Sequence, residues 1–271
     1  MSNEANVFTI RGNDGGIIKL ETHNALFSTA DIARWHAAKG LPDRYVVFTD
    51  KRLLESGETE SGIYMSVLLR PSIFPSQAPL LGHMAATAML TALKDHTDTE
   101  LGIGWVGDLY ANGVRIGESS IEGKLDNYTT YEYIIFTYSI KISEANFPPR
   151  LTDIIKQVFE DGNSSRMVIM AKNLLVRFFA LYSEIKTSSK FMDIYSENFI
   201  LRGKHVRYID GQKKRRMRVL SVDVNTGALV LDGPGKKPLF VSSPSNVIIP
   251  KRVKIKKKKS SKEKDNAGAD K

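Results

Sequence analysis

The strongest constraint on the fold is a tight turn between two strand-like stretches near the middle of the chain. Residues 104–123 read GWVGDLYANGVRIGESSIEG, in which Ala111-Asn112-Gly113 separates the two stretches. Asn and Gly tolerate the positive φ angles that tight hairpin turns need, and the flanking residues are typical of strands. The sequence therefore predicts an antiparallel hairpin, and the remaining elements must fit around paired strands.

Strands and helices follow one another on both sides of this hairpin, and we find no internal repeat. Runs of β-branched and aromatic residues predict three strands, at Tyr45–Asp50, Ile63–Arg70 and Tyr131–Ile142, with a polar loop between the first two. Helix formers with apolar residues three to four apart predict four helices, at Phe27–Lys39, Ala78–Lys94, Leu151–Phe159 and Met167–Tyr195. We expect an α+β fold with a mixed, mainly antiparallel sheet and flanking helices over residues 1–200.

The pattern of predicted secondary structure changes after Gly203. Five short strand-like runs follow, separated by turn pairs such as Asp210-Gly211, Thr226-Gly227 and Pro234-Gly235. Many short strands in about fifty residues predict a small β-barrel over residues 201–250. The last segment, residues 251–271, is rich in lysine and is predicted to be a disordered basic tail.

The net charge of +9 is concentrated in that tail. Residues 251–271 hold ten Lys/Arg and three Asp/Glu, so the other residues are nearly neutral. Nucleic-acid binding by the tail stays open, but the tail lacks interleaved aromatic residues, and a solubilising role is preferred.

Composition excludes several other classes. The chain has no cysteine, so disulfides, Cys-ligated metals and thiol nucleophiles are ruled out. No stretch is long and apolar enough to span a membrane, and the first residues do not resemble a signal or transit peptide. We expect a cytoplasmic protein with no membrane partner.

The central hairpin resembles the signature of the biotin protein ligase family. That signature reads Lys-Trp-Pro-Asn-Asp-hydrophobic-Tyr, a short turn, and then Lys-Lys-hydrophobic-small-Gly-Ile. The order of elements from residue 20 to residue 250 is also similar, which implies a catalytic domain like that of class II aminoacyl-tRNA synthetases followed by an SH3-like domain. The matching residues are Trp105, Asp108, Leu109, Tyr110, Asn112 and Gly113, with Arg115 in place of the second lysine.

The resemblance implies an ATP-dependent ligase that forms biotinyl-AMP from biotin and ATP, with Mg²⁺, and transfers biotin to a lysine of a carrier protein. Arg115 would stabilise the negative charge that develops in the reaction, and Asp108 would be its partner. The implied ligand-binding residues are Ser28, Thr29, Arg52, Trp105 and Gly117. Two of these assignments have structural alternatives, because Asp108 could cap a turn and Trp105 could anchor the core. We predict no metal ligands.

Several positions depart from the family pattern. The family's Gly-Arg-Gly-Arg-Arg-Gly adenylate loop is replaced by the shorter, acidic segment Leu53–Glu60, and Glu118 stands where a close-packed glycine is expected. Gly104, Val106-Gly107, Lys141 and Ala30 also replace polar or conformationally special residues of the pattern. These changes predict impaired ATP binding.

Two functions therefore stay open: a divergent biotin- or lipoate-type ligase, and a non-catalytic scaffold that binds a small ligand or a protein. A sheet edge could dock a carrier domain or a second copy of the chain.

Overall fold

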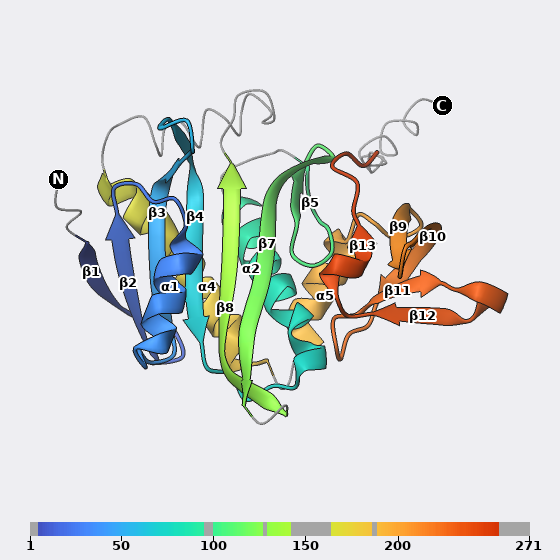
Figure 1. The fold of residues 1–271 in the computed structure, drawn as a ribbon, viewed down its shortest axis with the longest axis horizontal. Coiled ribbons are helices and arrows are strands. Elements are labelled where there is room, and N and C mark those ends of the chain that lie inside the picture. Colours follow the sequence, from blue (N-terminus) through green and yellow to red (C-terminus); the bar gives the residue numbers. More distant parts are fainter. Residues whose placement is uncertain (1–4, 95–99, 127–128, 142–163, 186–188, 255–271) are drawn as a thin grey trace, which may run out of the picture.

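The chain folds into a large sheet with helices on both faces, next to a smaller curled sheet (Figure 1). The computed structural model describes residues 5–94, 100–126, 129–141, 164–185 and 189–254. Within these residues only β2 and β3 of the large sheet pair in parallel, and all other neighbouring strands are antiparallel. The predicted α+β class is confirmed.

The large sheet has eight strands in the order β1-β2-β3-β4-β8-β7-β6-β5. They are β1 (Asn6–Arg11), β2 (Ile17–His23), β3 (Tyr45–Leu53), β4 (Thr59–Leu69), β5 (Leu101–Ile103), β6 (Leu109–Ala111), β7 (Val114–Asp126) and β8 (Thr130–Lys141). The predicted hairpin is formed by β6 and β7, with Asn112 and Gly113 at positive φ in its turn.

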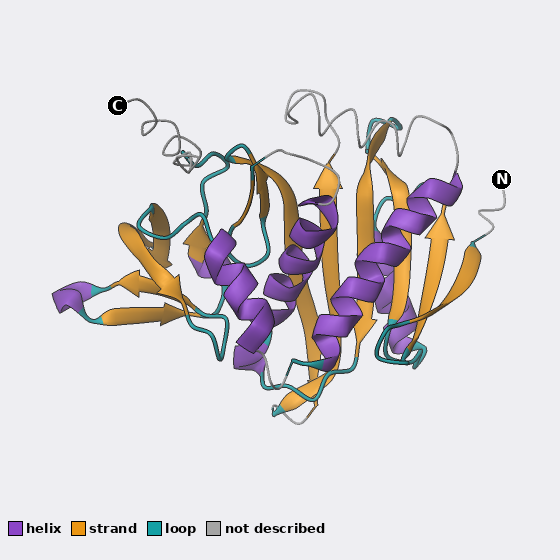
Figure 2. Cartoon of the chain, turned by 180° about the vertical axis from the view of Figure 1, so that it is seen from behind, coloured by secondary structure: helices purple, strands orange, loops and turns teal. Residues whose placement is uncertain are grey.

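Helices cover the two faces of this sheet unequally. Helix α1 (Thr29–Ala38) lies on one face, whereas α2 (Pro79–Lys94), α4 (Ser164–Ser183) and α5 (Ser189–Asn198) lie on the other, with the short helix η1 (Pro75–Gln77) before α2 (Figures 1 and 2). Strand β3 shows how the core is divided: Val46 and Phe48 pack on the face with three helices, and Val47 packs under α1. Within the described residues, much of the α1 face is thus left without a helix.

The helix predicted over Met167–Tyr195 is two helices in the structure. Helix α4 ends at Ser183, whose hydroxyl donates to the carbonyl of Ala180 at 2.7 Å. Such local side-chain to backbone bonds compete with helix continuation. The predicted helix Leu151–Phe159 lies outside the described residues.

The predicted polar loop between β3 and β4 is largely strand. Arg52 pairs with Glu60 and Leu53 with Thr59, and only residues 54–58 turn, closed by a bond from the Leu54 amide to the Glu58 carbonyl at 2.9 Å. The prediction was wrong because charged side chains on exposed strand ends look like a loop in sequence.

The small sheet has the strand order β12-β11-β10-β9-β13. Its elements are β9 (His205–Asp210), β10 (Lys213–Val222), β11 (Leu229–Asp232), η2 (Pro234–Lys236), β12 (Pro238–Val241), η3 (Pro244–Asn246) and β13 (Val247–Ile248). A register shift between Val219 and Ser221 interrupts the pairing of β10 with β11, as expected in a curled sheet. This arrangement is consistent with the predicted small barrel-like domain.

Residues 251–254, which the sequence placed at the start of the tail, pack against the hairpin. Arg252 forms a β-bridge with Val114, and the Val253 amide donates to the Gly113 carbonyl at 2.8 Å. The side chain of Val253 is buried. The rest of the predicted tail lies outside the described residues.

The two sheets meet at the Thr226-Gly227 turn. The Gly227 carbonyl accepts hydrogen bonds from Trp105 Nε1 at 2.8 Å and from His83 Nε2 at 2.9 Å. His83 is fully buried, and this burial lowers its pKa to about 4, so the ring is neutral and carries its proton on Nε2. The contact fixes the small sheet against α2 and against the loop before β6.

Candidate functional site

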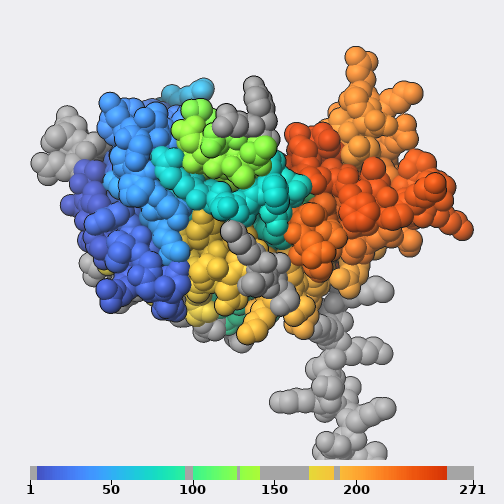
Figure 3. Space-filling model, turned by 90° about the horizontal axis from the view of Figure 1, so that it is seen from below, coloured from blue at the N-terminus to red at the C-terminus, as the bar shows by residue number. Residues whose placement is uncertain are grey.

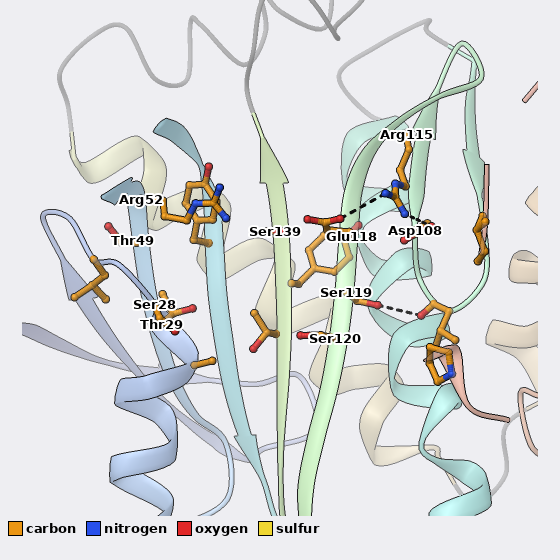
Figure 4. A pocket seen from close by; sticks show the side chains of 18 of the residues that line it. Ser28, Thr29, Thr49, Arg52, Asp108, Arg115, Glu118, Ser119, Ser120 and Ser139 are labelled. Atoms are coloured by element: carbon orange, nitrogen blue, oxygen red, sulfur yellow. Dashed lines mark hydrogen bonds and ion pairs between the residues drawn. The ribbon is translucent and has the colours of Figure 1, made fainter. Parts of the chain in front are cut away.

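A pocket of about 460 Å³ lies on the face of the large sheet that α1 leaves open. Its walls come from the start of α1, from β3, β4, β7 and β8, from the loop before β6 and from the end of the small sheet (Figure 4). The small sheet closes one side of the pocket through Pro244, Val247 and Ile249.

One wall of the pocket is built from uncharged hydroxyl groups. Thr29 and Ser66 are linked at 2.7 Å, and Ser66 and Thr137 at 2.9 Å, so three hydroxyls form a chain from α1 across two strands. Ser28 caps α1 by accepting a hydrogen bond from the Asp31 amide at 3.1 Å. Alternation along the strands leaves these polar side chains on the α1 face. Ser66 is fully buried, whereas Ser28, Thr29 and Thr137 line the pocket, where their hydroxyls can hydrogen-bond a polar, uncharged group.

The opposite wall carries a charged cluster on the hairpin (Figure 4). Arg115 donates from Nη1 to Asp108 Oδ2 at 3.2 Å, and its Nη2 lies 3.7 Å from Glu118 Oε2. The side chain of Arg115 is partly exposed, while that of Asp108 is buried. The hairpin thus presents one guanidinium held between two carboxylates.

Burial has a large effect on Asp108. It raises the pKa of the carboxyl to about 6, while the adjacent Arg115 guanidinium opposes the rise and Glu118 adds to it. Desolvation disfavours the charged form of a carboxyl, which explains why burial outweighs the ion pair. Within the described residues the Asp108 carboxylate is paired with Arg115 and caps no backbone amide of its turn.

A carboxyl with a raised pKa binds its proton more tightly in the folded state. Its contribution to stability is therefore fully present below the unfolded pKa of about 4 and is lost as the pH rises through 6. We expect the free energy of unfolding of Asp108→Asn, minus that of the wild type, to rise by about 2 to 3 kcal/mol between pH 4 and pH 7.

Urea unfolding of both proteins across this pH range measures that difference. His83 titrates in the opposite direction, because its lowered pKa makes the fold lose stability as the pH falls from 6.5 towards 4. Its effect is common to both proteins and cancels. A difference that stays constant with pH would contradict the burial of a charged Asp108.

A second cation lies across the pocket from the hairpin. Arg52 on β3 is 2.8 Å from Glu60 Oε2, and that carboxylate also accepts a hydrogen bond from the Tyr64 hydroxyl at 2.9 Å. The Arg52 guanidinium lies 5.4 Å from the centre of the Tyr64 ring. Arg52 is therefore already neutralised by a neighbour on the paired strand.

Six of the seven site residues suggested by the sequence line this pocket, namely Ser28, Thr29, Arg52, Trp105, Asp108 and Arg115. Gly117 does not, because a side chain there would meet Tyr138, Ile140 and Leu109 on the packed face of the sheet. Trp105 combines both of its suggested roles: it borders the pocket, but it is 1% exposed and bonded to Gly227.

A smaller hollow of about 330 Å³ lies on the other side of Arg115. Its lining includes Arg115, Lys251 and Arg252, with Glu118 as the one acidic side chain among the described residues that line it. The Lys251 carbonyl accepts a hydrogen bond from the Arg115 amide at 3.0 Å, which holds residues 251 and 252 at this place. Three cations thus converge beside the pocket, two of them from the segment predicted as tail.

Two glycines allow the pocket loop to pack closely on helix α2. A side chain at Gly82 would lie 1.8 Å from the Val106 carbonyl oxygen, and one at Gly107 would lie 2.4 Å from the Gly82 carbonyl oxygen. Gly107 also has a φ of 120°, which other residues rarely adopt. This contact fixes the loop that carries Trp105 and Asp108.

Two features are absent from the described residues. They contain no group of three or more His, Asp or Glu side chains arranged to hold a metal ion. Their helices are all too short or too polar to cross a membrane.

Comparison with known proteins identifies the fold. No family model matches the sequence. The bifunctional ligase/repressor BirA of Bacillus subtilis is 26% identical over 141 residues, a match that spans 49% of this chain and only 43% of BirA. The chain therefore matches less than half the length of this relative.

Solved structures agree over most of the chain. The apo biotin protein ligase of Aquifex aeolicus superimposes with a TM-score of 0.60, covering 84% of this chain and 97% of that one at 15% identity. The same enzyme in complex with biotin and ATP gives 0.59 at 15% identity, with 84% and 97% covered. A biotin protein ligase-like protein of unknown function from Silicibacter sp. gives 0.62 at 15% identity, covering 83% and 94%.

The chain thus has the biotin protein ligase fold, and the resemblance predicted from its sequence is confirmed at the level of the fold. Among its structural relatives are both a ligase solved in complex with biotin and ATP and a ligase-like protein of unknown function.

Proposed function

We propose that the protein binds a small organic acid of the biotin type in the pocket over the large sheet. The observation that carries this proposal is the polarity of the pocket, which has Arg115 on one wall and a chain of uncharged hydroxyls on the other. The shared fold supports it, because the Aquifex aeolicus ligase was solved with biotin and ATP.

The pocket chemistry suits a molecule with one charged end and one polar end. A carboxylate can accept two parallel hydrogen bonds from the planar guanidinium of Arg115. The hydroxyls of Thr29 and Thr137 can exchange hydrogen bonds with an amide or urea group at the other end. A volume of about 460 Å³ falls within the range of small-molecule sites.

The charges do not favour a triphosphate in this pocket. Arg52 is paired with Glu60, and Arg115 is held by Asp108 and Glu118, so three carboxylates offset the two arginines and leave no excess positive charge for a polyanion, whereas a single ligand carboxylate needs less compensation. Carboxylates near a polyanion raise its energy, and the effect grows as the site is desolvated. Binding of the acid without its activation is the function that this geometry supports best.

ATP-dependent ligation is the second candidate, and the hollow formed by Arg115, Lys251 and Arg252 favours it. An oxygen of the bound carboxylate would attack the α-phosphorus of ATP, and the bond from that phosphorus to pyrophosphate would break with its electron pair. A lysine amine would then attack the acyl carbon and release AMP. Arg115 would stabilise the oxygens on which negative charge develops.

Isothermal titration with biotin, ATP and a stable biotinyl-AMP mimic tests both candidates. We expect the wild type to bind biotin, and Arg115→Ala to weaken its binding at least about tenfold, or about 1.4 kcal/mol. Arg11→Ala is the matched control, because it removes an exposed arginine of β1 far along the sheet from β7. An unchanged affinity in Arg115→Ala would contradict the proposed carboxylate site.

Pyrophosphate exchange separates the two candidates. Biotin-dependent exchange of labelled pyrophosphate into ATP would establish activation and replace the binding proposal by the ligase. Biotin binding without exchange would support the non-catalytic function. If neither biotin nor the mimic binds, the proposal fails for this class of acid.

A further inference from the structure

The outer face of the small sheet carries a dense group of basic side chains. Strands β9 and β10 form an antiparallel ribbon whose Val206 and Met217 point into the core. The alternate residues point outward, and in the space-filling view this orange segment stands out from the body of the molecule (Figure 3). We call this outward-facing set the basic face; it comprises His205, Arg207, Lys214, Arg216 and Arg218.

The centre of the basic face is two arginines in direct cross-strand register. Arg207 lies opposite Arg216, and both side chains are exposed. Like charges directly opposite each other destabilise a sheet. Within the described residues neither arginine has an ion-pair partner, whereas Arg218 lies 3.4 Å from Asp232. The fold thus keeps an unfavourable pair that an external anion would relieve.

A hollow of about 430 Å³ accompanies these arginines. It is lined by His205, Val206, Arg207, Arg216, Ile248 and Pro250, and within the part of the chain that the structure describes no acidic side chain is among its lining residues. Ile248 on β13 is paired with Arg207 on β9, so the surface around the arginine pair extends over a third strand. The site combines forked donors with a concave surface.

We propose that the basic face binds the phosphate backbone of a double-stranded nucleic acid. Side chains on one face of a strand recur about every 6.8 Å, which is twice the axial rise of about 3.4 Å per phosphate along one strand of B-DNA. Guanidinium groups match phosphate oxygens in bidentate geometry.

Charge composition distinguishes this surface from a protein-docking site. The centre of a protein interface is depleted in charged residues and enriched in aromatic ones. The basic face shows the reverse, since its centre is an arginine pair. Its contacts would be to phosphates rather than to base edges, so we expect little dependence on nucleotide sequence.

Fluorescence anisotropy with a labelled 20-base-pair DNA duplex, and with an RNA duplex of the same sequence, tests the proposal on the full chain. We expect Arg207→Glu/Arg216→Glu to weaken binding at least about tenfold, and the slope of log affinity against log salt concentration to shrink by about two. The control Arg11→Glu/Lys190→Glu changes the net charge equally at exposed sites elsewhere and should bind as the wild type does.

A second variant, in which Lys256 to Lys259 are all replaced by glutamine, separates the basic face from the lysine-rich end of the chain. Loss of binding in this variant, with normal binding in Arg207→Glu/Arg216→Glu, would overturn the proposal. Equal loss in the Arg11→Glu/Lys190→Glu control would also overturn it, because net charge alone would then explain binding. Displacement of the duplex by polyglutamate at matched charge would point to a general polyanion site and count against the proposal.

Discussion

Replacing Trp105 by alanine is expected to lower the free energy of unfolding by about 3 to 5 kcal/mol. The indole ring is 1% exposed, and its Nε1 donates to the Gly227 carbonyl at 2.8 Å. Truncation would leave a cavity between the two sheets and remove one of the two donors to that carbonyl. Both effects act at the joint between the two sheets, which is the contact of Trp105 and His83 with Gly227.

Urea unfolding followed by circular dichroism measures this loss, and the only other tryptophan supplies the control. Trp35 is 58% exposed on α1, so Trp35→Ala should change the stability by about 0.5 kcal/mol or less. Trp105→Phe keeps most of the ring and should cost about 0.5 to 1.5 kcal/mol, for the lost hydrogen bond alone, because His83 still donates to the Gly227 carbonyl. Similar stabilities for Trp105→Ala and Trp35→Ala would show that the joint contributes little.

Replacing Gly82 by alanine is expected to destabilise the protein by about 3 kcal/mol or more, at or beyond the usual cost of overpacking. Alanine in place of glycine inside a helix normally stabilises by up to about 1 kcal/mol, so the expected sign is reversed. The reason is steric, because the new Cβ would lie 1.8 Å from the Val106 carbonyl oxygen. Helix α2 and the pocket loop would have to separate.

The control for this substitution is Ala85→Gly, which lies one turn later in α2 and should cost about 1 kcal/mol through helix propensity. Thermal or urea unfolding of both variants provides the comparison. A Gly82→Ala protein as stable as the wild type would mean that the loop does not approach the helix as closely as described.

The parts of the fold that the sequence predicted well are set by local interactions. The turn at Asn112-Gly113 and the Ser28 cap of α1 depend on residues within a few positions of each other. The pairing of Arg52 with Glu60 was not foreseen, because an exposed strand end and a polar loop have similar compositions. Likewise, residues 251–254 look like a tail by composition, yet their backbone pairs with a hairpin more than a hundred residues away.

The same distinction applies to the pocket. The residues expected from the resemblance, apart from Gly117, were brought together by the fold. Thr137 and Ser139 were not singled out, although they alternate with Phe136 and Tyr138, a period-two pattern that indicates one polar face of a strand. The compensation of Arg115 by Glu118 was also missed, because side-chain pairing depends on rotamers that the sequence does not specify.

Strand β13 separates two surfaces of different chemistry. Val247 and Ile249 face the pocket over the large sheet, whereas Ile248 and Pro250 face the hollow beside Arg207 and Arg216. Because strand side chains alternate, a slip of one residue would exchange the two sets and alter both surfaces at once. An insertion or deletion in the short connection from β12 to β13 should therefore disrupt both surfaces together, whereas a point substitution can alter one surface and leave the other intact.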